Sequence, residues 1–171
     1  MCSSTRRSIA HARQRAAEPG RAIAYECADY LEMEYEEAFD LAVLIYCDYG
    51  ALSPAEGEAL LARIRRSLRP GGMLVLDAFT PEKYAAFPGR RVWERHENGG
   101  FWRPDPHIAL HEDCRYDGLV TLEKTVILTP GEAQTHLIWH RYFSRESLSA
   151  DLGAAGFRDL SFYGDVAGSP W

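Results

Sequence analysis

The sequence has few cysteines, and they lie far from one another. The four are Cys2, Cys27, Cys47 and Cys114, and they form no C-x-x-C pair. Metal centres and disulfide frameworks of small proteins need more closely organised cysteines, so we expect neither a metal site nor disulfides. This cysteine usage favours a reducing, cytoplasmic location.

Long apolar runs and an excess of positive charge are also missing. No apolar stretch approaches the roughly 20 residues that a membrane-spanning helix needs. The 19 lysine and arginine side chains are outnumbered by 25 aspartate and glutamate side chains, which gives a formal net charge of -6 at pH 7. Nucleic acids and anionic membranes attract concentrated positive charge, so we expect neither as a partner.

Acidic residues are absent from the start of the chain, MCSSTRRSIAHARQRAA. Such an Arg- and Ser-rich composition is typical of transit peptides. The alternative, which we favour, is a basic surface helix with Ile9, Ala12 and Ala16 on one face. The Pro19-Gly20 pair would end that helix.

The remaining composition is that of one globular domain. Hydrophobic residues make up 46% and charged residues 26% of the 171 positions, which suffices for a single hydrophobic core. Residues 21–26 alternate in polarity and predict a short strand, and residues 29–37 form an acidic loop. Residues 39–46 are a longer apolar strand that ends at Tyr46, and Cys47, Asp48 and Tyr49 follow it.

A helix and a second apolar strand follow. Ser53 and Pro54 predict the helix start, residues 54–69 carry Leu60, Leu61, Ile64 and Leu68 on one side, and Pro70-Gly71-Gly72 ends the helix. The segment MLVLDAF, residues 73–79, is then apolar except for Asp77. Two strands that are apolar throughout and joined by a helix predict a parallel sheet covered by helices on both faces.

After Pro81 the pattern becomes antiparallel. Residues 90–97, 107–116, 119–128 and 133–143 have mixed polarity and are separated by turn residues, with hairpin turns at 116–119 and 129–131. Ser144 caps a predicted helix that contains Leu148 and Leu152 and ends at Gly156. Residues 157–164, FRDLSFYG, predict a last strand.

These segments, in this order, resemble the class I S-adenosylmethionine-dependent methyltransferases. The resemblance rests on the Asp29-Tyr30 loop, on FDLAVLIYCDYGALSPAE, on LRPGGMLVLDAF and on AAGFRDLSFYG. It implies an α/β Rossmann-like sheet, truncated at both ends, with an antiparallel β insertion after the fifth family strand. Residues 1–80 would be a partial cofactor-binding core, 81–143 the insertion that covers the methyl acceptor, and 144–171 the return to the core, within one domain.

The resemblance also implies residue roles. Asp29 would accept a hydrogen bond from the adenine amino group of S-adenosylmethionine, and the Tyr30 backbone would contact the ring. The backbone of Ile45 and Tyr46 would meet the methionine end of the cofactor. The residues expected to face a small-molecule acceptor are Asp48, Tyr49, Trp102, His140 and Tyr142.

Each role has a structural alternative. Asp29 would equally cap a turn, Tyr49 would pack in the core, and aromatic residues or histidines in strands are usually structural. Methyl transfer depends on in-line approach and orientation, so no catalytic residue is obligatory. Where the acceptor must lose a proton, His140, His136 or His111 is the candidate base.

Three family elements have no counterpart in the sequence. No glycine-rich turn occurs, Ser3 stands where the acid that holds the ribose hydroxyls would be, and no final antiparallel strand follows Gly164. We therefore expect a partial sheet in which the strand at 39–46 either pairs with residues 21–26 or keeps an open edge.

Three functions compete on this basis. The first is an S-adenosylmethionine-dependent methyltransferase for a small molecule, a partial chain with weak or no activity alone. The alternative is a non-catalytic interaction subunit that self-associates through its open sheet edge. A nucleotide-dependent oxidoreductase is a third reading, which the missing glycine-rich turn and the LRPGG segment disfavour.

Overall fold

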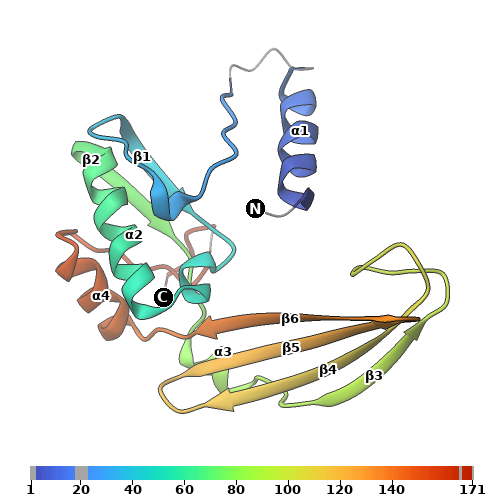
Figure 1. The fold of residues 1–171 in the computed structure, drawn as a ribbon. Coiled ribbons are helices and arrows are strands. Elements are labelled where there is room, and N and C mark those ends of the chain that lie inside the picture. The colour runs from blue at the N-terminus through green and yellow to red at the C-terminus, as the bar shows by residue number, and fades with distance from the viewer. Residues whose placement is uncertain (1–2, 18–22, 166, 171) are drawn as a thin grey trace.

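The computed structural model describes residues 3–17, 23–165 and 167–170, and Figure 1 shows two sheets that meet at one end. The first is a pair of parallel strands, and the second contains four antiparallel strands. The elements are, in order, α1 (Ser3–Ala17), η1 (Tyr30–Glu32), β1 (Phe39–Leu44), η2 (Asp48–Ala51), α2 (Pro54–Ser67), β2 (Leu68–Leu76), α3 (Pro81–Ala85), β3 (Arg91–His96), β4 (His107–Tyr116), β5 (Val120–Thr129), β6 (Glu132–Arg141) and α4 (Arg145–Ala154).

The parallel pair confirms the predicted strand–helix–strand unit. Leu41 of β1 lies opposite Met73 of β2, and Leu44 lies opposite Leu76. A capping box starts α2, in which the Ser53 hydroxyl accepts the Glu56 N–H while the Glu56 carboxylate accepts the Ser53 N–H.

The end of α2 corrects the sequence prediction, which placed the boundary after Arg69. The helix ends at Ser67, and Leu68 already has extended backbone angles. The residue before a proline avoids the helical region, so Pro70 forces Arg69 into the strand. There the Arg69 guanidinium pairs with the Asp40 carboxylate of β1 at 2.8 Å.

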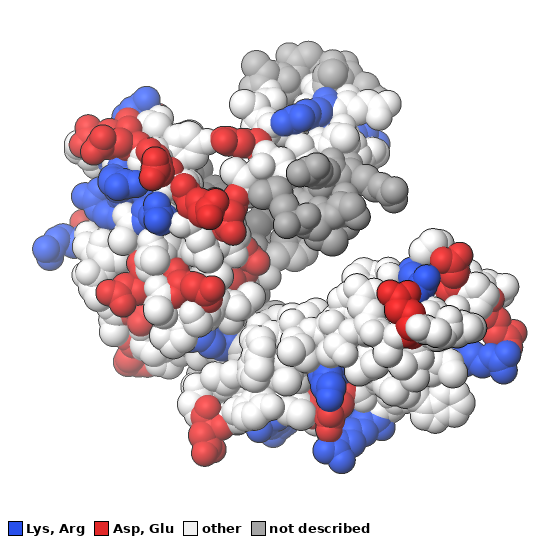
Figure 2. All heavy atoms as spheres, viewed as in Figure 1, with Lys and Arg blue, Asp and Glu red and all other residues white. Residues whose placement is uncertain are grey.

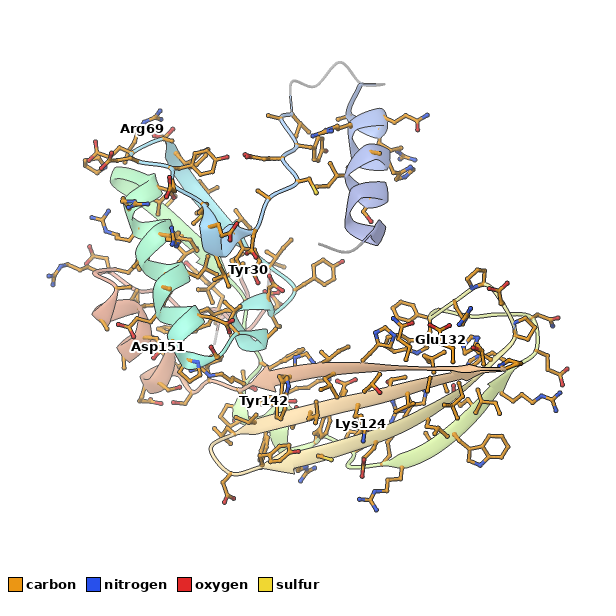
Figure 3. All side chains as sticks on the ribbon, in the orientation of Figure 1. Tyr30, Arg69, Lys124, Glu132, Tyr142 and Asp151 are labelled. Atoms are coloured by element: carbon orange, nitrogen blue, oxygen red, sulfur yellow. The ribbon has the colours of Figure 1, made fainter. Side chains whose placement is uncertain are left out.

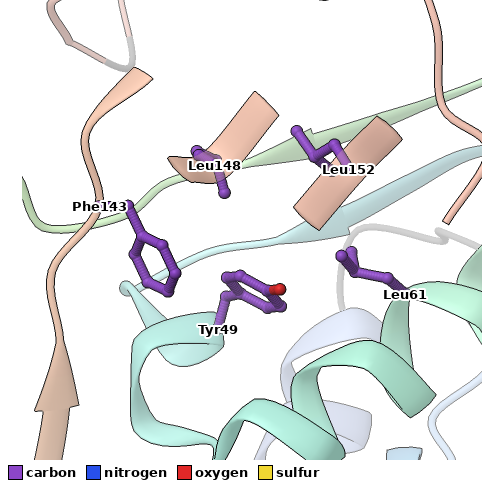
Figure 4. Packing of buried hydrophobic residues seen from close by; sticks show 5 residues of the cluster. All are labelled: Tyr49, Leu61, Phe143, Leu148 and Leu152. Carbon is purple, nitrogen blue, oxygen red and sulfur yellow. The ribbon is translucent and has the colours of Figure 1, made fainter. Parts of the chain in front are cut away.

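The core lies on one face of the β1–β2 pair, between that pair and helices α2 and α4. Buried side chains there form two clusters, which are Tyr49, Leu61, Phe143, Leu148 and Leu152, shown in Figure 4, and Leu52, Leu60, Ile64 and Leu68. Alternate strand residues, among them Leu44 and Leu74, pack against both clusters. The opposite face of the pair is exposed, because Leu41, Val43 and Met73 stay open to solvent.

The antiparallel sheet has the order β3-β4-β5-β6, and its strands begin and end within two residues of the predicted segments. The two predicted hairpin turns are also confirmed. Gly118 and Gly131 have φ of 77° and 86°, the left-handed conformation that glycine adopts at little cost. The short helix α3, which the sequence pattern did not predict, leads from β2 into this sheet.

Two predicted strands are wrong. Residues 23–26 are not in a strand, and residues 21–22 lie outside the described residues. Residues 157–164 contain only an isolated bridge between Tyr163 and Pro170. A strand is defined by its partner, and the described residues place no strand beside either segment or along the outer edges of β1 and β2.

The first helix is confirmed as α1, and Ala16 of its predicted apolar face is buried. The predicted breaker at Pro19-Gly20 lies outside the described residues. Among the helices that the structure describes, none has both the length and the apolar character to cross a membrane.

Candidate functional site

The carboxyl ends of β1 and β2 lie side by side and form a rim held by Asp77. Tyr46 and Cys47 follow β1 with φ of 68° and 55°, an unusual left-handed backbone for residues other than glycine. Their N–H groups donate to the two Asp77 carboxylate oxygens, at 3.2 Å from Tyr46 and 2.8 Å from Cys47. The end of β2 thus fixes the loop that leaves β1.

The thiol of Cys47 lies in this rim and is partly buried. Burial raises the pKa of this thiol to about 11, and the negative charge of Asp77 adds to the rise. Cys47 is therefore a neutral thiol at physiological pH, and reactive thiolate chemistry is not available there.

This pKa gives a direct prediction. In a variant with Cys2, Cys27 and Cys114 changed to serine, alkylation by iodoacetamide should rise with pH toward a midpoint near 11 in the native state, against the ordinary thiol pKa of 9.0 in urea. At pH 9 the native reaction should be about 50-fold slower than the unfolded one. The folded state keeps the thiol proton to higher pH than the unfolded state does. The stability that this difference in pKa contributes is therefore present below pH 9 and is lost as the pH rises from about 9 to 11. A native midpoint near 9 would contradict the burial.

The predicted adenine-side residues lie on η1, next to the rim. The Asp29 carboxylate caps this turn by accepting the Leu31 N–H at 2.9 Å. Arg63 of α2 donates to the Met33 carbonyl at 2.9 Å and so holds the turn against the helix. Asp29 thus has the turn-capping contact named as its structural alternative, and its carboxylate retains lone pairs for a further donor.

Tyr30 and Asp48 come together at this place, although they are distant in sequence. Burial raises the pKa of the Tyr30 phenol to about 12, and the charge and hydrogen bonding of Asp48 contribute next. Figure 3 labels Tyr30 at the carboxyl end of β1, near the start of η2. Asp29, Asp48 and Asp77 make this an acidic rim, which is suited to ligands that carry amino or hydroxyl donors.

Tyr49 does not face this rim. Its side chain is 1% exposed, and its hydroxyl donates to the Asp151 carboxylate of α4 at 2.9 Å. The same carboxylate lies 3.6 Å from the Arg141 guanidinium at the end of β6. Tyr49 therefore has the core position named as its alternative, and it joins η2, α4 and β6.

His140 and Tyr142 do lie beside the rim, against Phe79 just after β2. The ring centroid of Phe79 is 5.3 Å from that of His140 and 5.8 Å from that of Tyr142. Tyr142 is buried, with its hydroxyl 2.9 Å from the Thr121 hydroxyl. His140 Nε2 lies 3.4 Å from a Glu123 carboxylate oxygen, whereas its buried Nδ1 has no hydrogen-bond partner among the described residues.

Trp102 lies away from the other predicted site residues. It belongs to the loop between β3 and β4 and packs on His136, with 4.8 Å between ring centroids. His136 precedes His140 by four residues on β6, or about 14 Å along an extended strand. The structure therefore does not bring Trp102 into the group formed by Phe79, His140 and Tyr142.

Three residues of this region are missing from the sequence prediction, namely Asp77, Phe79 and Glu123. Asp77 had a signal, because it ends an apolar strand as Asp48 follows the other one. The position of Glu123 depends on the β5–β6 register, in which Thr121 faces His140. No group of three or more His, Cys, Asp or Glu side chains in the described part of the chain could hold a metal ion.

Comparisons with known proteins show what the chain is similar to. Residues 2–72 match the sequence pattern of a family described as a methyltransferase domain. No curated protein matches the chain.

The solved structures that resemble the chain include methyltransferases of low sequence identity. The CcbJ methyltransferase from Streptomyces caelestis is 15% identical with a TM-score of 0.66, over 95% of this chain and 65% of that one. An S-adenosylmethionine-dependent methyltransferase from Clostridium acetobutylicum is 12% identical with a TM-score of 0.60, over 85% and 58%. The amino pentose methyltransferase CalS10 from Micromonospora echinaspora is 22% identical with a TM-score of 0.52, over 82% and 59%.

The chain thus spans about three fifths of the length of these solved structures. The likeness confirms the predicted Rossmann-like methyltransferase fold, including the antiparallel strands that follow β2. With a methyltransferase-domain match over residues 2–72, this chain has the fold of the class I S-adenosylmethionine-dependent methyltransferases.

Proposed function

We propose that the chain is part of an S-adenosylmethionine-dependent methyltransferase that acts on a small molecule. The observation that supports this most is the rim at the carboxyl ends of β1 and β2, where Asp29, Tyr30 and Asp48 lie close to the loop held by Asp77. Ligands of open α/β sheets bind at this edge. CalS10, which is an amino pentose methyltransferase, has been solved with S-adenosylmethionine bound.

Within this proposal the residues divide into a cofactor side and an acceptor side. The Asp29 carboxylate would accept the adenine amino group, the Tyr30 backbone would lie along the ring, and the backbone of Ile45 and Tyr46 would approach the methionine end. S-adenosylmethionine would supply the methyl group, and the protein would hold the acceptor in line with it. The natural compartment of this activity is the cytoplasm, in keeping with the scattered cysteines.

On the acceptor side, Asp48, His140 and Tyr142 would lie around the space between the rim and the end of β6. His140 lies against Glu123 and makes a T-shaped ring contact with Phe79, so its ring orientation is set before any acceptor arrives. Residues 81–143 would cover the acceptor, with residues 1–80 and 144–171 forming the cofactor side. Trp102 would join the acceptor only if the loop between β3 and β4 moved toward the rim.

The sequence offers no glycine-rich turn for the ribose and carboxylate of the cofactor, so we expect this chain to bind S-adenosylmethionine more weakly than micromolar. Saturation-transfer NMR with millimolar S-adenosylmethionine should show contacts to the adenine protons. Asp29→Ala should remove most of this signal, because it removes the adenine acceptor.

Asp117→Ala is the matched control, since Asp117 is an exposed acid in the β4–β5 hairpin. It should leave the adenine signal unchanged. Equal signals in both variants, or none in the unmodified chain at millimolar ligand, would refute the proposed cofactor side. Micromolar affinity by calorimetry would instead refute the expectation of weak binding.

The alternative function, a non-catalytic interaction subunit, is favoured by a separate observation. In the described residues, β1 pairs only with β2, and the exposed face of this pair carries Leu41, Val43, Met73 and Val75. The other edge of β1, which has no strand beside it in the described residues, is a template for pairing with another chain. Self-association that depends on Val43 would support this reading.

A further inference from the structure

The four-stranded antiparallel sheet has two chemically different faces, and one of them is apolar and uncovered. In the β4–β5 register Leu110 lies opposite Val126, and in the β5–β6 register Leu122 lies opposite Trp139. Trp93 of β3 continues the same face, opposite Leu110. The apolar face comprises Trp93, Ile108, Leu110, Leu122, Val126, Leu128, Leu137 and Trp139.

The large side chains of this face are open to solvent except for Leu122, which is 7% exposed. Trp93 is 67% exposed, Leu137 is 53% exposed and Trp139 is 42% exposed. Ordinary protein surfaces rarely carry an exposed group of aromatic and aliphatic side chains of this extent. Such a group usually marks an interaction surface. Tryptophan is also enriched among the residues that dominate binding energy.

The opposite face already has a role in the proposed site. It carries the histidines of the sheet, and His140 contacts Phe79 beside the rim. A partner bound to the apolar face would therefore leave the acceptor side of the sheet free.

Charges on the apolar face are few and paired within it. Glu112 lies between Arg91 and Lys124, at 2.7 Å from the first and 3.8 Å from the second. Figure 2 shows a short blue and red row across a sheet surface that is otherwise largely uncharged. This face therefore does not select a strongly acidic or strongly basic partner.

Its size matches one side of a stable protein interface. Three strands of ten residues and one of six, about 4.8 Å apart and with about 3.4 Å per residue, give a face of roughly 590 Å² in projection. Because side chains project from the sheet, the accessible area of the face is larger than this projection. It approaches the area of about 800 Å² that each partner buries in a standard interface.

We propose that two copies of this chain pack through these apolar faces and form a two-fold symmetric dimer. Sheets pack face to face about 10 Å apart, and a two-fold interface presents the same residues from both partners. An axis parallel to the strands would place β6 of one copy over β3 of the other. Leu137 and Trp139 of one copy would then approach a hollow of about 470 Å³ on the other copy. That hollow lies beside Trp93 and is also lined by Leu110, Glu112 and Lys124.

Sedimentation velocity of the 171-residue chain over a concentration series tests this dimer. The unmodified chain should reach twice its 19.3 kDa mass at micromolar concentration. Leu137→Arg places a charge in the interface of both partners and should raise the dimer dissociation constant at least tenfold. Trp93→Arg, at an independent exposed position, should do the same.

Ile138→Arg is the matched control. Ile138 is the next residue of β6, points to the opposite face and is 41% exposed, so the change is equally polar but outside the interface. It should leave the dissociation constant within twofold. Val43→Arg separates the dimer from pairing through β1 and should also have no effect.

Three results would overturn the proposal. They are a monomer at every concentration, a dimer that survives both Leu137→Arg and Trp93→Arg, and a dimer that Ile138→Arg or Val43→Arg dissociates. Circular dichroism of each variant identifies any loss of folding, and Trp93→Arg and Leu137→Arg lie on different strands, so one misfolded variant leaves the other decisive.

Discussion

Tyr49→Ala should lower the free energy of unfolding by about 3–5 kcal/mol, as large core aromatic truncations do. Tyr49 is 1% exposed and packs with Leu61, Phe143, Leu148 and Leu152. Its ring also lies against α2 at Gly57, where an added Cβ would stand 3.2 Å from a ring carbon. Truncation leaves a cavity between η2, α2 and α4, and the loss is a large share of a typical domain stability of about 5–15 kcal/mol.

Urea unfolding followed by circular dichroism measures this loss. Tyr49→Phe is the matched variant, because it keeps the ring and removes only the hydrogen bond to Asp151. Its cost should be about 1 kcal/mol, since Asp151 still lies near Arg141. Equal effects of the two substitutions would mean that the hydroxyl and not the ring supports this core.

Asp77→Ala should lower the free energy of unfolding by about 2–3 kcal/mol, because one hydrogen bond to a charged group contributes about 1.5–3 kcal/mol and the second bond here, from Tyr46, is long and exposed. Asp77 accepts two N–H groups from Tyr46 and Cys47, both in the left-handed conformation. Without the carboxylate, nothing else named at the rim holds these two residues. Amide hydrogen exchange at both positions should accelerate at least 30-fold, and the adenine signal in the NMR experiment should fall.

Two controls sharpen this result. Asp77→Asn keeps one acceptor oxygen, so its effect should lie between those of the unmodified chain and Asp77→Ala. Asp40→Ala removes a carboxylate whose side chain is 81% exposed and paired with Arg69, and it should cost less than about 0.5 kcal/mol. If Asp40→Ala proved as costly as Asp77→Ala, the rim would not depend on Asp77.

Local patterns predicted much of the fold. The alternation and turn residues after Pro81 placed β3 to β6 within two residues, because a hairpin is set by neighbouring residues and by its turn. The strands predicted at 21–26 and 157–164 failed for the complementary reason. A strand needs a partner, and periodicity within one segment does not reveal whether a partner lies beside it.

The candidate site shows the same division. The apolar run that ends at Tyr46 indicated a ligand edge from sequence alone, and the structure brings Tyr30 and Asp48 together there. The burial of Tyr49, by contrast, depends on α4 packing against η2, which joins residues that are distant in the chain. The packing of Trp102 on His136, away from His140, joins a loop to a distant strand and was equally invisible in the sequence.

The sequence by itself determined the strand–helix–strand unit of β1, α2 and β2, the run of strands β3 to β6, the family resemblance and the polar residues that follow β1 and β2. These features depend on short-range patterns of apolar, turn and capping residues. Only the tertiary structure decided that Asp77 holds the rim, that Tyr49 belongs to the core, and that the antiparallel sheet exposes an apolar face. Each of those outcomes depends on contacts between distant segments, because burial and hydrogen bonding are properties of the packed chain.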